Sequence, residues 1–257
     1  MQASRATRSG SVTRRILLLA LLLIAGTVLL ALNHPTRTES LAESTGQAAG
    51  NGFQRLRNLV LGPPRIGLQV GHLDAEAHPE ELARLRVSTG GLGGGMQEVD
   101  VNRAVAAALA ERLERRGIAV DLLPATVPPR YRAELVVAIH ADSSLEPGRR
   151  GYKSAVFRPV RNRWDERLKR ALDSAYLAGS SLPDDDANVT GDMLEYYAFN
   201  GSFRHSVARR TPAAIVEIGY LSHPSDRELL RRPDRVAALL EEGITAFLEQ
   251  RGRLGGH

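Results

Sequence analysis

The sequence predicts an α/β fold, a three-layer sandwich built around a largely parallel central sheet. Two patterns lead to this prediction: short runs rich in Val and Ile recur along the chain, and segments with helical periodicity separate several of them. Strands that alternate with helices are typical of parallel sheets with helices packed on their faces. The chain has 257 residues, of which 43% are hydrophobic and 25% charged, a composition that belongs to a globular protein with a sizeable core.

The predicted strands are short and apolar. They occupy residues 66–71 (IGLQVG), 118–123 (IAVDLL), 135–140 (LVVAIH), 152–157 (YKSAVF) and 213–220 (AAIVEIGY). The run LVVAI carries no polar residue, as expected of a strand that is buried on both faces. Because ligands of open parallel sheets bind at the carboxyl ends of the strands, these ends are the places to search for a site.

Three segments have the periodicity of amphipathic helices. The clearest is 99–116, in which apolar residues recur every three or four positions and Gly117 stands where a C-cap is expected. The segments 163–178 and 235–249 show the same pattern. These helices supply the connections that a parallel sheet requires.

The N-terminal part of the chain has the pattern of a membrane anchor. Residues 1–15 are basic and contain no acid, and residues 16–32 (ILLLALLLIAGTVLLAL) form an unbroken apolar run. As a helix this run spans roughly 25 Å, close to the hydrocarbon core of a bilayer at about 30 Å. We expect a transmembrane helix, or alternatively a cleaved signal peptide, followed by a flexible linker over 33–64, a folded domain over 65–251 and a tail over 252–257.

The charge pattern predicts which side of the membrane the domain occupies. Basic residues before an apolar segment stay in the cytoplasm, so the domain after it is expected to be extracytoplasmic, either membrane-tethered as a single-pass protein or secreted after cleavage. The net charge is +5, but basic and acidic residues are interleaved, which argues against nucleic acid as a partner. The chain has no cysteine, which excludes disulfides and thiolate metal ligands.

Residues capable of chemistry stand at the ends of three predicted strands and at the start of a helix. His72 follows the first strand, His140 ends the third, Glu217 lies inside the last, and Glu98 heads the helix over 99–116. Each has a structural alternative: a hydrogen-bonded histidine, or a carboxylate in the first turn of a helix. Two imidazoles and one carboxylate gathered at one sheet edge match the His₂Glu set of catalytic zinc sites, and a second carboxylate suits a general base.

Glu217 has a separate structural alternative. An isolated carboxylate in an apolar strand is costly to bury, so it can be expected to pair with a cation. Arg209 and Arg210 are the candidates from the sequence.

Four motifs give the chain a family resemblance. The order VGH, QEVDVN, VVAIHAD and PAAIVEIGYLSH resembles the zinc-dependent N-acetylmuramoyl-L-alanine amidases of type 3, over roughly residues 66–249. These are cell-wall hydrolases with a phosphorylase/hydrolase-like α/β fold. The resemblance implies an amidase-like catalytic domain that takes Zn²⁺ at His72, Glu98 and His140. It also implies that Glu217 activates the water, and that the substrate is peptidoglycan, cleaved between N-acetylmuramic acid and L-alanine.

The chain departs from the family pattern beside these motifs. The family usually continues its first motif as Gly-His-Gly-Gly, whereas here a long segment over 73–97 follows, with a glycine cluster that predicts a loop beside the site. Asp142 stands where the family usually has Asn. Asp74, Asp142 and His205 are candidates for contacts to the metal-binding histidines or to substrate. His78 and His223 are expected to be exposed.

Two other segments have predicted structural roles. The aromatic cluster within 196–203 is expected to pack in the core or in a lid, and residues 182–188 (LPDDDAN) are expected to form a solvated loop.

Two other functions remain open from the sequence. A zinc carboxypeptidase-like peptidase also joins two His and one Glu ligand to a catalytic Glu, but it usually carries His-x-x-Glu, and Ala75 stands at that spacing from His72. The other alternative is a catalytically inactive domain that binds the cell wall, which the altered segment after His72 suggests.

Overall fold

A central sheet organises the molecule. A computed structural model describes residues 62–146 and 148–254, and its five-stranded sheet has the order β4-β1-β5-β7-β6. The strands are β1 (Arg65–Val70), β4 (Ala119–Leu123), β5 (Val136–Asp142), β6 (Lys153–Ala155) and β7 (Ala213–Tyr220). Neighbouring strands are parallel except β6, which runs antiparallel to β7 at the edge. The prediction of a largely parallel sheet is therefore confirmed.

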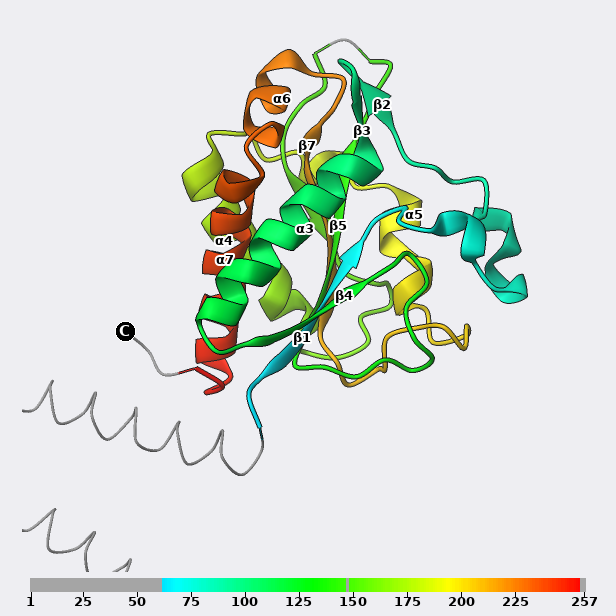
Figure 1. Ribbon diagram of the computed structural model, residues 1–257, viewed down its shortest axis with the longest axis vertical. Helices are drawn as coiled ribbons and strands as arrows, with labels where there is room; N and C mark the ends of the chain where they lie inside the picture. Colours follow the sequence, from blue (N-terminus) through cyan, green and yellow to red (C-terminus); the bar gives the residue numbers. More distant parts are fainter. Residues whose placement is uncertain (1–61, 147, 255–257) are drawn as a thin grey trace, which may run out of the picture. The chain divides into compact units, whose positions relative to one another are not determined.

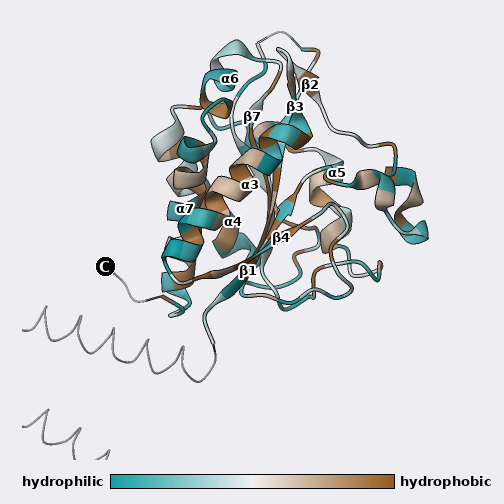
Figure 2. Ribbon diagram, viewed as in Figure 1, coloured by the Kyte–Doolittle hydropathy of each residue, from teal (hydrophilic) through white to brown (hydrophobic). Residues whose placement is uncertain are grey.

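Three long helices cover one face of this sheet. They are α3 (Glu98–Arg115), α4 (Asp165–Ser180) and α7 (Pro233–Gln250), close to their predicted bounds. Helix α3 packs on β1, β4 and β5, while α4 packs on β6 and β7, and α7 lies against both helices (Figure 1). Figure 2 shows the strands as mainly hydrophobic and the helices as mixed, as expected of helices with one buried side.

The opposite face of the sheet has a different cover. It is packed by loops and by short helices, among them α5 (Gly191–Leu194) and a 3₁₀ turn at Tyr197–Phe199. The three-layer prediction thus holds for the sheet and one helical layer, whereas the other layer contains no long helix among the described residues. A short helix, α6 (Pro224–Leu230), follows the last strand.

Alternation along β5 decides which side chains reach each face. Val137 and Ile139 belong to the core beneath the long helices, whereas Val136 and Ala138 belong to the core on the opposite face. Because the side-chain period of a strand is two, His140 extends on the same side as Val136 and Ala138. The last imidazole of the strand therefore reaches the face that carries the short helices.

The segment between β1 and α3 is folded rather than open. It contains 3₁₀ helices at Ala75–Ala77 and Glu80–Leu85, and a hairpin of β2 (Leu92–Gly93) with β3 (Met96–Gln97) that leads directly into α3. The segment lies beside the site, as the sequence predicts, but it contains 3₁₀ turns and a hairpin rather than loop alone. Its backbone hydrogen bonds to the strands and to its own turns hold it beside the sheet.

The predicted transmembrane segment, 16–32, and the linker up to residue 61 lie outside the described residues. Within 62–146 and 148–254, none of the helices combines the length and the apolar character that crossing a bilayer would require.

Candidate metal centre and active site

His72 occupies the turn directly after β1. Its backbone is left-handed, with a φ of 65°, which turns the chain sharply away from the strand. The Nδ1 atom lies 2.8 Å from the carbonyl oxygen of Ser88, and Nε2 lies 3.2 Å from Oε1 of Glu98. Because Nδ1–H donates to the Ser88 carbonyl, Nε2 is left with its lone pair toward the carboxylate.

Glu98 begins α3 and is buried. Its Oε2 accepts a hydrogen bond from the backbone N–H of Gly91 at 2.7 Å, which holds the carboxylate from the hairpin side. Its Oε1 lies 2.9 Å from Nδ1 of His140 and 3.2 Å from Nε2 of His72. One oxygen of this carboxylate is therefore aimed between the two imidazoles.

His140 is oriented from its far side by a hydrogen-bonded chain. Its Nε2 lies 2.9 Å from the hydroxyl oxygen of Tyr196, and that hydroxyl donates to Oε1 of Gln69 at 3.0 Å. Gln69 in turn donates to the carbonyl of Ala125 at 2.6 Å. Burial raises the pKa of Tyr196 well above its usual value, so the phenol keeps the proton that it donates. The chain favours the tautomer with a proton on Nε2 and leaves Nδ1 free to act as a ligand.

These three residues fit a metal ion by their donor set. The ligand atoms of His72, Glu98 and His140 all lie within 4.8 Å of one another. Both imidazoles have their outer nitrogen occupied by an acceptor, the arrangement that orients histidines in metal sites. Two imidazoles and one carboxylate are ligands that zinc accepts in catalytic sites, where a fourth position stays open. The cluster can hold a metal.

The pKa values in the cluster follow from this packing. Burial acts to raise the pKa of Glu98, but hydrogen bonds and charge from His140 and His72 outweigh it and lower the pKa. Burial acts to lower the pKa of His72, but the hydrogen bond and charge of Glu98, with the Ser88 carbonyl, outweigh it and raise the pKa. These interactions require a proton on the nitrogen that faces Glu98, and a bound metal ion would take the place of that proton. The carboxylate is thus ionised, as a metal ligand must be.

Gly71 makes room for the imidazole of His140. A Cβ at this position would lie 2.5 to 2.6 Å from three atoms of the ring, a separation that cannot be tolerated. The ring therefore packs directly on the backbone at the end of β1. The absence of a side chain at residue 71 is a steric requirement of the site.

The cluster opens into a cavity of about 320 Å³. The lining residues come from the ends of β1, β5 and β7, from β6, from the segment between β1 and α3, and from the short helices on the same face. They include His72, His78, Arg84, Glu98, His140, Asp142, Lys153, Thr190, Asp192, Tyr196, Tyr197 and Glu217. The cavity lies at the carboxyl ends of the parallel strands, as the rule for open α/β sheets predicts.

Glu217 lies on the wall of this cavity, in register with His140 on the neighbouring strand. Its Oε2 is shielded from solvent and has no hydrogen-bond partner among the described residues. Burial raises the pKa of Glu217 well above its usual value; the charges of Glu98 and Asp142 raise it further, and Lys153 opposes them. A carboxyl group with a raised pKa beside a cluster that can hold a metal is suited to accept and return a proton.

The cation beside Glu217 is Lys153, not Arg209 or Arg210. Lys153 stands opposite Glu217 in the antiparallel register of β6 and β7. Within the described part of the chain, no ion pair joins Glu217 to either arginine, and Nε of Arg209 donates instead to the carbonyl of Arg161. The pairing expected from the sequence is wrong because the strand register, and not distance along the chain, decides the neighbour.

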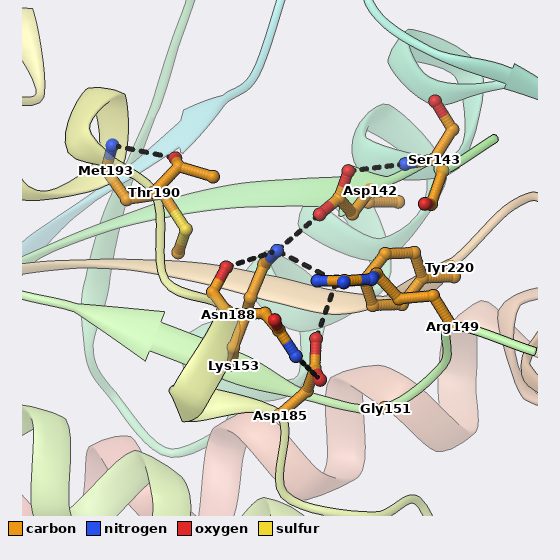
Figure 3. Close-up of polar contacts among 12 residues, drawn as sticks. Asp142, Ser143, Arg149, Gly151, Lys153, Asp185, Asn188, Thr190, Met193 and Tyr220 are labelled. Carbon is orange, nitrogen blue, oxygen red and sulfur yellow. Dashed lines mark hydrogen bonds and ion pairs between the residues drawn. The ribbon is translucent and has the colours of Figure 1, made fainter. Parts of the chain in front are cut away.

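Lys153 is buried in a polar network (Figure 3). Its ammonium lies 2.5 Å from Oδ2 of Asp142, 2.9 Å from the hydroxyl of Tyr220 and 3.1 Å from the carbonyl of Asn188. The Tyr220 hydroxyl donates to Asp185 at 2.6 Å. Three acceptors satisfy the three N–H groups of the ammonium, so its charge is held in one place.

The three candidates for contacts to the metal-binding histidines or to substrate have different surroundings. Asp142 lines the cavity, but its carboxylate is paired with Lys153. Asp74 is exposed and lies outside the cavity lining. The partner that orients His72 is the carbonyl of Ser88, not Asp74. His205 is also outside the lining, because its Nδ1 pairs with Glu81 at 2.8 Å.

Other expectations about single residues need correction. His78 is only 4% exposed, lines the cavity and has Nδ1 2.6 Å from the hydroxyl of Thr126, so its predicted exposure is wrong. His223 is half-buried. The loop over 182–188 is not wholly solvated, because Asp185 is buried against Tyr220.

The aromatic segment after α5 packs as expected. Tyr196 and Phe199 are buried in the core on the short-helix face. The sequence reasoning missed the roles of Tyr196 toward His140, of Ser88 toward His72 and of Lys153 toward Glu217. Only Lys153 carried a signal, as a lysine in an apolar strand.

Comparisons with known proteins give the chain a family. The model of the N-acetylmuramoyl-L-alanine amidase family matches residues 66–249. None of the curated proteins matches the chain.

Solved structures of several amidases share the fold. The amidase Ami1 of Mycobacterium smegmatis is 16% identical, with a TM-score of 0.54 over 73% of this chain and 97% of that one. An N-acetylmuramoyl-L-alanine amidase of Clostridium difficile 630 is 15% identical, with a TM-score of 0.53 over 74% and 98%. The CwlD amidase of Clostridioides difficile, in complex with the GerS lipoprotein, is 17% identical, with a TM-score of 0.51 over 73% and 99%. At these identities the likeness concerns the fold.

Proposed function

The chain belongs to the N-acetylmuramoyl-L-alanine amidase family, and we propose that it is a zinc-dependent peptidoglycan hydrolase that cleaves the amide bond between N-acetylmuramic acid and L-alanine. One observation carries the proposal: His72, Glu98 and His140 form a cluster that can hold a metal, and it opens into the same cavity as Glu217. Metal-dependent hydrolysis of an amide combines an electrophilic ion with a general base, and this cavity offers groups for both.

The ion would be held by Nε2 of His72, Oε1 of Glu98 and Nδ1 of His140. When bound, zinc polarises a carbonyl group and lowers the pKa of a water molecule. Ser88 and Tyr196 orient the two imidazoles from outside, so that the ligand nitrogens are presented without a proton.

Glu217 would move the proton. Its carboxylate accepts a proton from the attacking water and then delivers it to the departing amine of L-alanine, so that the amide C–N bond breaks as the new C–O bond is completed. Its raised pKa suits this role, because burial makes the carboxylate a stronger base than an ordinary glutamate and lets it hold the proton until the amine departs. Lys153 opposes that rise and favours the ionised form needed for the first step.

We further propose that the domain acts outside the cytoplasm. The support is the basic segment 1–15 followed by the apolar run 16–32, which together have the pattern of a membrane anchor or a signal peptide. Either outcome delivers the catalytic domain to the compartment that contains peptidoglycan.

The test is hydrolysis of purified muropeptides by the full chain and by Glu217→Gln. We expect kcat to fall by about 10²- to 10⁴-fold, the usual contribution of a general base. Zinc content is expected to stay unchanged, since Glu217 is not among the proposed ligands. Chelation is expected to abolish hydrolysis, and zinc is expected to restore it.

Mass analysis of the products separates this function from the others. Release of the whole stem peptide supports the amidase, whereas release of a single terminal amino acid would indicate a carboxypeptidase. Full activity of metal-free protein would contradict the zinc mechanism. Zinc binding without hydrolysis of any muropeptide or of whole wall would indicate the inactive wall-binding domain.

A further inference from the structure

A second cavity, of about 300 Å³, lies on the same face of the sheet as the metal centre. We call it the arginine cavity. Its lining consists of Arg130, Phe157, Pro159, Val160, Arg161, Phe199, Asn200, Gly201, Ser202, Val207 and Arg209. Tyr196 and Tyr197 line the first cavity, which contains His72, Glu98 and His140, while Phe199 and Asn200 line the arginine cavity. One short segment therefore separates the two cavities.

We propose that the arginine cavity is a binding site for an oxyanion, a carboxylate or phosphate group attached to a small apolar moiety. The proposal does not depend on the amidase function, because it uses none of the groups of the metal centre. Its first support is charge: Arg130, Arg161 and Arg209 line the cavity, none of its lining residues is acidic, and of the three only Arg161 has an ionic partner, Asp165, among the described residues.

Arg130 and Arg209 have only neutral partners among the described residues. Arg130 donates to the carbonyl of Gly201 at 2.8 Å and to the hydroxyl of Ser206 at 3.2 Å. Arg209 donates to the carbonyl of Arg161 at 3.3 Å. These bonds position the guanidinium groups but do not neutralise them, and guanidinium groups bind carboxylate and phosphate through paired N–H donors.

Arg161 is held mainly by the protein itself. Its side chain is only 6% exposed, and its amino groups pair with Asp165 at 3.2 Å and donate to the carbonyls of Thr211 at 2.9 Å and Val207 at 3.3 Å. Its Nε is shielded from solvent and has no hydrogen-bond partner within the described part of the chain. Because Arg161 has an ionic partner, Arg130 and Arg209 are the two lining guanidinium groups without an ion pair among the described residues.

Backbone conformation at Arg130 points in the same direction. Its φ is 51°, in the left-handed region that residues other than Gly, Asn and Asp seldom adopt. Strain of this kind persists where the surrounding structure requires it and is concentrated at binding sites. Here it accompanies a guanidinium that is already held by Gly201 and Ser206 at the edge of the cavity.

The rest of the cavity wall is apolar and indicates the kind of group that the oxyanion is attached to. Phe157, Pro159, Val160, Phe199 and Val207 give the cavity an apolar side. A volume of about 300 Å³ is at the lower limit of small-molecule pockets and fits one amino-acid-sized group, not a membrane surface. Carboxylates of wall peptides and phosphates of other envelope components are both oxyanions that guanidinium groups can bind. Comparing a carboxylate probe with a phosphate probe distinguishes the two sources.

The test is titration calorimetry of the purified full chain with inorganic phosphate and, separately, with glutarate as a dicarboxylate. The variant Arg130→Gln/Arg209→Gln is expected to weaken the preferred probe by about tenfold or more, the loss that follows from removing charge-assisted hydrogen bonds. The matched control is Arg103→Gln/Arg115→Gln, which removes the same charge from α3, outside the cavity. The affinity of this control variant for the preferred probe is expected to equal that of the unmodified chain.

A second variant distinguishes loss of binding from misfolding. Arg130→Gly removes the guanidinium while allowing the positive φ without strain, so it is expected to fold and still lose affinity. Stronger binding of glutarate than of phosphate assigns the site to carboxylates, and the reverse order assigns it to phosphates. Binding of neither probe by the unmodified chain, or equal affinity in the arginine-cavity variant and its control, would overturn the proposal. Zinc content and muropeptide hydrolysis, measured on the same samples, report separately on the amidase function.

Discussion

Nε2 of His140 lies 2.9 Å from the hydroxyl oxygen of Tyr196, on the opposite side of the ring from Glu98. The two residues are 56 positions apart, and the tyrosine comes from the short segment that covers the sheet. Because that hydroxyl donates to Gln69, its oxygen is available to accept the Nε2 proton. Tyr196 therefore decides which nitrogen of His140 faces Glu98 in the cluster that can hold a metal.

We expect Tyr196→Phe to lower the affinity for zinc by about 10- to 100-fold, because His140 loses the partner that fixes its tautomer and ring orientation. The measurement is competition with a chromophoric chelator. Tyr197→Phe is the matched control: Tyr197 also lines the cavity, but its hydroxyl donates to the carbonyl of Ala125, accepts from Gln69 and has no bond to a histidine among the described residues. Equal affinities of the two variants would contradict a role for Tyr196.

Gly71→Ala is expected to displace the imidazole of His140, because the added Cβ would lie 2.5 to 2.6 Å from ring atoms. We expect the zinc content after dialysis to fall by at least about tenfold, in line with a disturbed ligand geometry. In Gly191→Ala the new methyl group meets nothing within 4 Å, so this control is expected to retain its zinc. Full zinc content in Gly71→Ala would show that the ring has room to move.

Lys153→Met is expected to lower the free energy of unfolding by about 3 kcal/mol, because it leaves Asp142 without its cation in a poorly solvated place. Urea unfolding followed by circular dichroism measures the change. Lys153→Met/Asp142→Asn is expected to recover part of the loss, since the second substitution removes the unpaired charge. Arg103→Met breaks an exposed pair with Asp100 and is expected to cost less than about 1 kcal/mol. Strictly additive single and double variants would contradict the coupling.

Glu81 ties the segment between β1 and α3 to the loop that carries His205. Hydrogen bonds from the backbone N–H groups of His205 and Arg204 lower the pKa of Glu81 from 4.5 to about 2. A depressed carboxyl pKa adds stability that is fully present above 4.5 and is lost as the pH falls toward about 2. The stability difference between the unmodified chain and Glu81→Gln is therefore expected to be constant near neutral pH and to shrink through this acidic range.

Thermal unfolding of both proteins across that range measures the difference. Glu80→Gln is the control, because Glu80 is highly exposed and pairs only with Arg86 among the described residues. Its effect is expected to be small at every pH. A Glu81→Gln difference that stays constant down to about pH 2 would contradict the linkage.

The long elements follow from local patterns. Helices α3, α4 and α7 and the five strands lie within a few residues of the segments whose periodicity predicts them. The spacing of apolar residues is a property of neighbouring positions, and it reflects the side of each element that must be buried. The gathering of His72, Glu98 and His140 is also predictable, since carboxyl ends of parallel strands meet at one edge.

The structure of the segment over 73–97 is less accessible to this reasoning. Its glycines and charges indicate a loop, yet it folds into 3₁₀ turns and a hairpin because Glu81, His78 and Arg86 find partners there and elsewhere in the fold. Side-chain hydrogen bonds of this kind join residues far apart in the chain, so the periodicity of the sequence does not predict them.

Local periodicity and strand-end chemistry thus establish the fold class and the candidate ligands, since both depend on neighbouring residues and on a general rule for parallel sheets. The partners of those ligands depend on packing. Ser88 beside His72, Tyr196 beside His140 and Lys153 opposite Glu217 are neighbours only once strand register and turn geometry are set. Contacts between distant segments fix the tautomers and pKa values on which the proposed chemistry depends, and these arise only in the folded chain.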